Sequence, residues 1–213
     1  METAEIRFQS LNIVLLYDPI SVHKIPLDPI KTSTPFTLIT LLPDEVAGGA
    51  LILGSDPLKL KATLQSNRFE YIDENDTPFT KRSLEPLGKL LNTLPLSLSV
   101  RSIGMNFFIR TTPVKGNDAG KFLAEHYVKD NLKIEQSLGQ PIFSVAIRLF
   151  LGTLDCYRDL RFTPVDLTGK EFILQYHLHK EIHIVETEKL LQTVNQSFFE
   201  SWKEFDQWID KLP

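Results

Sequence analysis

Residues 171–184 have the sequence EFILQYHLHKEIHI, and the alternation in this stretch decides the fold class. In a strand, successive side chains point to opposite faces. The apolar face then carries Phe172, Leu174, Tyr176, Leu178 and Ile182. The polar face carries Glu171, Gln175, His177, His179, Glu181 and His183. This alternation is typical of an antiparallel sheet that has one face on a core and the other in water.

The segments on either side of this strand extend the pattern. Strands are predicted over residues 142–151 and 154–163, and an amphipathic helix over about 186–212. Short links between consecutive strands favour antiparallel pairing, and the chain lacks the strand–helix alternation of a doubly wound parallel sheet. We therefore predict an α+β fold in which helices cover one face of a curved, mostly antiparallel sheet.

The N-terminal part of the chain contains a similar order of elements. Strands are predicted over residues 5–17, 36–42, 50–53, 58–72 (with a turn or bulge at Ser66-Asn67) and 100–109. A helix begins at the N-cap Ser83 and ends near Thr93, and another is capped by Asn117 or Asp118 and ends by Gly139. The order strand-strand-strand-helix thus occurs over 36–94 and again over 142–212. We predict a single globular unit, residues 1–213, made of two related halves at about 1–112 and 113–213.

The composition limits the classes of function. The chain has 213 residues, 42% hydrophobic and 23% charged, with a formal net charge of −4. These values are typical of a globular protein, and the acidic balance argues against nucleic acid as a partner. A local basic patch of Lys59, Lys61 and Arg68 is a candidate for nucleic-acid binding, although alternating lysines on a strand are more typical of edge protection. The acidic N-terminus and the short apolar run Ile13–Leu16 predict a cytoplasmic protein without membrane association.

Two segments resemble a known group of proteins. They are Leu64-Gln65-Ser66-Asn67-Arg68-Phe69 and Arg101-Ser102-Ile103-Gly104-Met105-Asn106-Phe107. Both are similar to strand motifs of a sporadically distributed bacterial family of uncharacterised, two-halved α+β proteins, often found in mobile or defence-associated regions. The resemblance implies a fold and implies no reaction.

The polar face of residues 171–184 holds the residues best suited to chemistry. Two imidazoles spaced two residues apart on a strand can ligate a divalent metal, so the candidate ligands are His177, His179, Glu181 and His183. The alternative interpretation is that this sheet face is exposed to solvent and that the histidines are ordinary polar residues on it. Because no further ligand pattern accompanies the histidines, the sequence predicts no metal site, no cofactor and no catalytic residue.

Three other features have structural interpretations. Gly116–Lys121 is one residue short of a phosphate-binding loop, and Phe122 stands where Ser or Thr should hold magnesium, so we predict a helix cap there. The charges Asp155, Arg158, Asp159 and Arg161 predict solvated pairs on an exposed strand. Cys156, the single cysteine, predicts a buried and inert thiol.

The C-terminal helix carries a wide apolar stripe. It consists of Leu191, Val194, Phe198, Trp202, Phe205, Ile209 and Leu212. Phe199 and Trp208 lie beside it and predict contact with another chain, whereas the simpler interpretation is that the whole stripe covers the sheet. We therefore expect a non-enzymatic interaction or accessory protein that binds a protein partner or associates with itself. The alternative is a metal-dependent hydrolase, or another enzyme, that uses the face with His177, His179 and His183.

Overall fold

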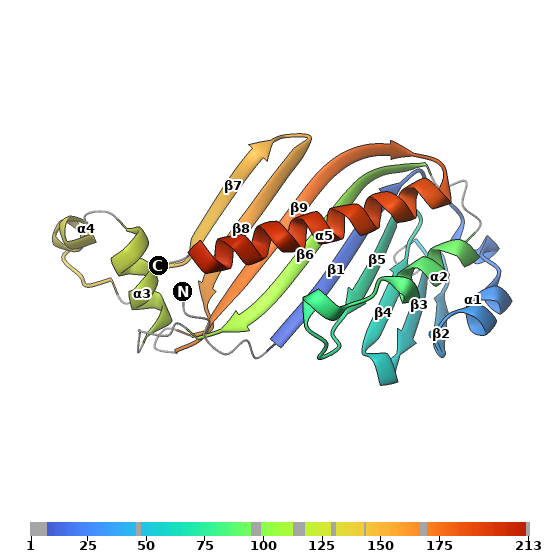
Figure 1. The fold of residues 1–213 in the computed structure, drawn as a ribbon, viewed down its shortest axis with the longest axis horizontal. Helices are drawn as coiled ribbons and strands as arrows, with labels where there is room; N and C mark the ends of the chain where they lie inside the picture. Colours follow the sequence, from blue (N-terminus) through green and yellow to red (C-terminus); the bar gives the residue numbers. More distant parts are fainter. Residues whose placement is uncertain are drawn as a thin grey trace.

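The computed structural model describes residues 8–45, 48–94, 99–112, 118–128, 131–142, 144–166 and 170–211. Within these ranges, nine strands form one antiparallel sheet in the order β2-β3-β4-β5-β1-β6-β9-β8-β7 (Figure 1). The strands are β1 (Phe8–Tyr17), β2 (Leu38–Leu42), β3 (Ala50–Ser55), β4 (Leu60–Leu64), β5 (Arg68–Asp73), β6 (Val100–Thr111), β7 (Ile147–Thr153), β8 (Cys156–Pro164) and β9 (Phe172–Ile184). The helices are α1 (Leu27–Ser33), α2 (Glu85–Thr93), α3 (Ala119–Tyr127), α4 (Asn131–Leu138) and α5 (Thr187–Lys211).

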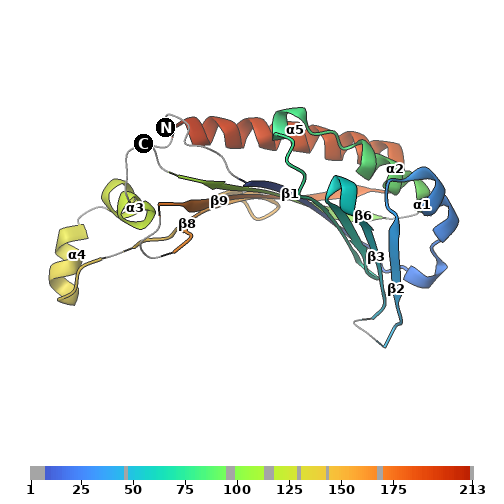
Figure 2. The same ribbon diagram turned by 90° about the horizontal axis from the view of Figure 1, so that it is seen from below.

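The sheet has two unlike faces. Figure 2 shows a curved sheet with α5, α2 and α1 on one side, while α3 and α4 lie at the end nearest β7 and β8. We call the face of the sheet on which α5 packs the covered face, and the opposite face the open face. The sheet runs without interruption between the two predicted halves, because β6 pairs with β1 on one side and with β9 on the other.

The covered face holds an aromatic core centred on Phe107 of β6, which is fully buried. Its ring lies 5.3 Å from that of Phe79 and 5.7 Å from that of Tyr176, both edge-to-face. Phe198 and Phe205 of α5 complete the cluster at 5.8 and 6.1 Å. Large aromatic side chains in such arrangements dominate the energy of a core.

Most predicted elements are present, although several boundaries differ. The turn predicted at Ser66-Asn67 separates β4 from β5, and Gln65 N donates to the carbonyl of Arg68 (2.8 Å). The N-cap prediction at Ser83 was wrong: α2 begins at Glu85, and Ser83 Oγ accepts from the Glu85 amide just outside the helix. The predicted helix up to Gly139 is two helices, α3 and α4.

Helix α1 lies in a proline-rich segment for which the sequence predicts no helix. Pro26 occupies its N-cap, and Pro29 is its third residue. Amides in the first turn have no intrahelical acceptor, so proline is tolerated at both positions. Among the described residues, none of the helices has the length and apolar character needed to span a bilayer.

Candidate functional sites

Strand β9 has the alternating faces that the sequence predicts. Phe172, Leu174, Tyr176 and Leu178 are buried on the covered face. Gln175, His177 and His179 are half-buried on the open face, and Glu181 and His183 are exposed. The pairing with β6 is regular from Thr111 to Ser102 and shifts between Ser102 and Val100, close to His183. The four candidate metal ligands therefore lie on one strand, and His177 and His179 lie in the part that pairs regularly with β6.

His177 is held by a residue of the neighbouring strand. Its Nδ1 lies 2.7 Å from Asn106 Oδ1, directly across the β6–β9 pair. An amide oxygen only accepts, so Nδ1 carries the proton, and in the neutral ring Nε2 is an acceptor. Burial lowers the pKa of His177, although the charge of Asp159 opposes this shift, so the ring is neutral at pH 7. Gly104 leaves space for it, since a Cβ there would lie 3.3 Å from His177 Cε1.

The candidate metal ligands are not grouped as a metal centre. His179 stacks on Tyr157 of β8, with ring centroids 5.0 Å apart, whereas His177 bonds to Asn106. Within the described ranges, no three side chains of His, Cys, Asp or Glu come together as metal ligands. These side chains are instead part of a wider polar surface on the open face.

The centre of this polar surface is Asp159 of β8, and here the prediction of a solvated charge was wrong. Asp159 is only 2% exposed. Arg148 of β7 donates to both carboxylate oxygens, from Nε (3.0 Å) and Nη2 (2.8 Å). Arg161 donates to Oδ2 from Nε (3.1 Å) and Nη2 (2.6 Å). Burial alone would raise the pKa of Asp159, but the bonds and charges of the two guanidinium groups outweigh it and lower the pKa to about 2.

A hollow of about 460 Å³ lies over these residues, and we call it the polar hollow. Its lining comes from β1, β6, β7, β8 and β9, around the Asp159 cluster and the His177–Asn106 pair. The other polar side chains that line it are Ser10, Asn12, Tyr157 and Gln175. Asn12 Nδ2 donates to Glu70, but its Oδ1 is buried without a hydrogen-bond partner among the described residues. The polar hollow thus offers both guanidinium donors and unused acceptors.

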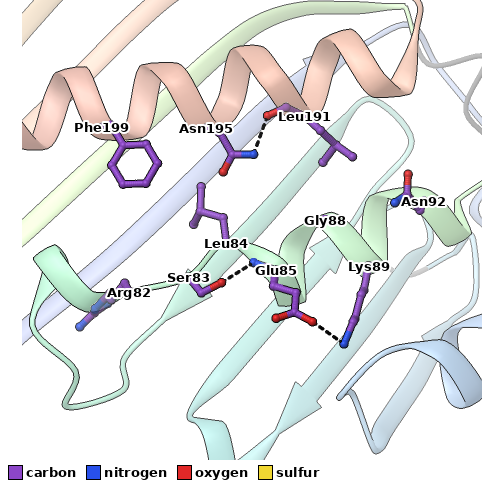
Figure 3. A pocket seen from close by; sticks show the side chains of 10 residues that line it. All are labelled: Arg82, Ser83, Leu84, Glu85, Gly88, Lys89, Asn92, Leu191, Asn195 and Phe199. Atoms are coloured by element: carbon purple, nitrogen blue, oxygen red, sulfur yellow. Dashed lines mark hydrogen bonds and ion pairs between the residues drawn. The ribbon is translucent and has the colours of Figure 1, made fainter.

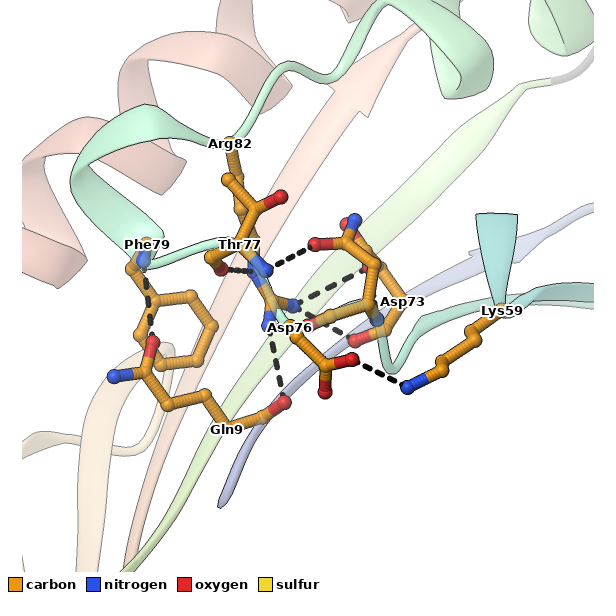
Figure 4. Close-up of polar contacts among 8 residues, drawn as sticks. Gln9, Lys59, Asp73, Asp76, Thr77, Phe79 and Arg82 are labelled. Atoms are coloured by element: carbon orange, nitrogen blue, oxygen red, sulfur yellow. Dashed lines mark hydrogen bonds and ion pairs between the residues drawn. The ribbon is translucent and has the colours of Figure 1, made fainter. Parts of the chain in front are cut away.

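Arg82 is a buried cation with a structural role (Figure 4). Nε donates to the Thr77 carbonyl, and Nη2 donates to those of Gln9 and Asn75. Nη1 donates to the Asp73 carbonyl and lies 3.4 Å from its carboxylate. Four hydrogen bonds to main-chain carbonyls and one ion pair therefore hold the guanidinium. No sequence pattern marks this cluster, because its acceptors are main-chain carbonyls from separate parts of the chain.

Cys156 and Asp118 test two further predictions. Cys156 is a free thiol that is half-buried, less than predicted, and Arg158 Nη1 lies 3.6 Å from its sulfur. Asp118 caps α3 by accepting from the Lys121 amide (2.9 Å), which confirms the helix cap at this position. Gly116 and Asn117, the first two residues of that motif, lie outside the described ranges.

Helix α5 confirms part of the predicted stripe. Val194, Phe198 and Phe205 are buried, whereas Trp202 is half-buried, with its ring 4.7 Å from that of Phe79. The side chain of Ile209 and the whole of Leu212 lie outside the described parts. Trp208, a predicted interaction residue, is half-buried, with its ring 5.6 Å from that of Tyr176.

Phe199, the other predicted interaction residue, is 60% exposed. It lines a groove of about 440 Å³ between α5 and the segment that contains α2. Figure 3 shows its ring beside Leu84 and Asn195, facing this segment. The groove is bordered by polar side chains, including the Glu85–Lys89 ion pair (2.7 Å). Phe199 is therefore available to a partner, whereas Trp208 already packs on the core.

Strand β7 forms one free edge of the sheet. The side chains of Leu149, Phe150 and Leu151 are exposed, and Leu154 follows in the turn at 91% exposure. Residues 154–155 form a two-residue turn, so Thr153 and Cys156 exchange main-chain hydrogen bonds. Because bonded and non-bonded pairs alternate along an antiparallel ladder, the even-numbered residues direct N–H and C=O away from β8. These residues are Arg148, Phe150 and Gly152.

Comparison with family models and with curated proteins gives no relative. No protein-family model matches the chain. A search of curated proteins also gives no significant match.

Proposed function

We propose that the protein is a non-enzymatic interaction or accessory protein that associates with itself through the free edge of β7. The observation that carries the proposal is the row of exposed apolar side chains Leu149, Phe150 and Leu151 on this edge. Proteins normally protect an edge strand with charge, proline, a bulge or a covering segment, because its free N–H and C=O groups pair readily with another strand.

The other edge strand, β2, is also apolar and has Leu38 and Leu41 exposed, but it is shorter than β7. Strand β2 has five residues and ends directly before Pro43, which cannot donate a hydrogen bond. Strand β7 has seven residues, without proline, lysine or glutamate. Its one charge, Arg148, is directed to Asp159 of the same chain. The β7 edge is therefore the better surface for pairing.

The sequence of β7 fits a second copy of itself. In an antiparallel pair about a two-fold axis through Phe150, Phe150 lies opposite its own copy and Arg148 lies opposite Gly152. Each of these positions directs main-chain groups to the edge, so the register satisfies donors and acceptors in turn. No like charges oppose each other, and the two phenylalanine rings form an aromatic cross-strand pair.

Further exposed apolar residues lie at the same end of the molecule. Helix α4 carries Leu132 and Leu138, both largely exposed, and Figures 1 and 2 place it beyond α3, at the end of the molecule where β7 and β8 lie. Exposed apolar patches on a folded protein commonly mark interaction sites. This concentration supports an association surface at the β7 end.

Sedimentation velocity over a range of concentrations tests the proposal. We expect wild-type protein to form a dimer and Phe150→Glu to remain a monomer, because the substitution places two carboxylates opposite each other. Phe199→Glu is the matched control, since Phe150 and Phe199 are both 60% exposed. It should dimerise like the wild type. Thermal melts of both variants serve to check that they fold.

Two outcomes contradict the β7 interface. A wild-type protein that stays monomeric at all concentrations contradicts self-association. Dissociation by Phe199→Glu but not by Phe150→Glu assigns the contact to the groove beside α5, as the sequence of that helix predicts. The alternative enzyme function that uses His177, His179, Glu181 and His183 stays a prediction.

The sequence resemblance also enters this proposal. We infer that β4, β5 and β6 carry the strand motifs of the sporadically distributed bacterial family, and that the two halves of the chain are related. The position of Leu64 and Arg68 on either side of the β4–β5 turn supports this inference. The cytoplasmic location and the defence association stay predictions.

A further inference from the structure

The polar hollow has a charge arrangement that a structural ion pair does not require. Arg148 and Arg161 lie directly opposite each other on β7 and β8. Like charges in this position destabilise a sheet. Asp159 is the acidic partner of both in the ion pairs of the described residues. One carboxylate therefore holds two cations, and one net positive charge remains on the surface.

Each of these two guanidinium groups also has N–H donors without an acceptor among the described residues. Each donates from Nε and Nη2 to Asp159, so three of its five N–H groups have no acceptor in the described part of the chain. Arg82 differs, because it donates four hydrogen bonds to main-chain carbonyls and also forms an ion pair with the buried Asp73. Arg148 and Arg161 are thus oriented by Asp159 while their remaining donors face outward, with the side chain of Arg161 43% exposed.

Acceptors for hydroxyl groups line the same hollow. His177 uses Nδ1 to hold Asn106, which leaves Nε2 as an acceptor. Asn12 Oδ1 is buried and accepts no hydrogen bond from a described residue. A buried acceptor without a partner is costly unless water or a ligand donates to it. A ligand that fills the hollow should therefore carry both an anionic group and hydroxyl groups.

We propose that the polar hollow binds a small phosphorylated polyol or sugar, with its phosphate on Arg148 and Arg161 and its hydroxyl groups on His177 and Asn12. Planar guanidinium groups suit phosphate because they donate two parallel bonds at a time. Two guanidinium groups provide more donors than a single carboxylate can accept, which favours a phosphomonoester. A hollow of about 460 Å³ is of the size that takes small molecules.

Isothermal titration at neutral pH and low salt, with ribose 5-phosphate as the probe, tests this inference. Inorganic phosphate, ribose and citrate serve as comparison probes. We expect ribose 5-phosphate to bind more tightly than inorganic phosphate, and ribose and citrate to bind least. Arg161→Gln should lower the affinity for ribose 5-phosphate by about tenfold or more. Arg161→Lys should recover part of the loss, since it restores the charge without the planar group.

Arg68→Gln is the matched control. Arg68 also lies on the open face, is 43% exposed and pairs with a carboxylate, Glu70 (3.2 Å), but it does not line the polar hollow. It should leave binding unchanged. His177→Leu should lower the affinity for ribose 5-phosphate and leave the affinity for inorganic phosphate unchanged, because it removes only an acceptor for a hydroxyl group. Arg148→Gln replaces Arg161→Gln if the latter does not fold.

Three results would overturn the inference. The first is that neither ribose 5-phosphate nor phosphate binds at concentrations up to about 10 mM. The second is that Arg68→Gln and Arg161→Gln lower the affinity for ribose 5-phosphate equally. The third is that a single-stranded oligonucleotide binds and the small probes do not. Arg161 lies on β8 and not on the free edge, so the Arg161 variants separate this test from the test of self-association. Arg148 lies on the free edge, 4.4 Å from the Phe150 ring, so its variant is also checked for self-association by sedimentation.

Discussion

The two faces of β6 and β9 differ in what stabilises their side chains. On the covered face, Phe107 and Tyr176 are fully buried and contact the aromatic residues of α5. On the open face, the adjacent residues Asn106 and His177 bond to each other beside the Asp159 cluster. Packing stabilises the first face and directional polar contacts organise the second. The open face can therefore accept a ligand without loss of core packing.

The largest expected effect comes from two neighbouring phenylalanines on opposite faces. Phe107→Ala should lower the free energy of unfolding by about 3–5 kcal/mol, because it removes a fully buried ring and leaves a cavity. Phe108→Ala, one residue further along β6 and half-buried on the open face, should cost about 1–2 kcal/mol. Urea denaturation of both variants measures the difference. Equal losses would show that the open face contributes as much packing as the covered face.

Helix α5 allows the same comparison within one element. Trp202→Ala should cost about 2–4 kcal/mol, since its ring packs on Phe79 and Phe107 while part of it remains accessible. Phe199→Ala should change stability by about 0.5 kcal/mol or less in the monomer, because Phe199 is largely exposed. Denaturation at a concentration below that of association measures both. A large loss for Phe199→Ala would mean that the groove beside α2 is part of the core.

The smallest expected effect concerns acid stability of the open face. The pKa of Asp159 is about 2 in the folded state, against 3.8 for an ordinary aspartate. The unfolded chain therefore takes up this proton first. The stabilisation is present above about pH 4 and is lost as the pH falls through 2, by at most about 2 kcal/mol.

Asp159→Asn should lack this component, so its stability should fall less than that of the wild type between about pH 5 and pH 2. Thermal melts across this range, at constant ionic strength, measure the difference. Identical slopes in the two proteins would mean that the two guanidinium groups do not stabilise the carboxylate.

Local periodicity was sufficient to predict much of the fold. The alternation in residues 171–184 predicted the covered and open faces of β9. The three- and four-residue steps of the apolar stripe predicted the side of α5 on which Val194, Phe198 and Phe205 are buried. Both signals arise within one element, where the direction of each side chain follows from the backbone alone. The aligned histidines were predicted for the same reason.

Tertiary structure alone decided the rest. Asp159 and Arg161 appear in the sequence as charges on a strand, but the burial of Asp159 depends on Arg148 from β7 and on β9 at its other side. The strand order also decides that β7, and not β8 or β9, is left with a free edge. Such features depend on which strands become neighbours and in what register, and that is set by contacts between residues far apart in the chain.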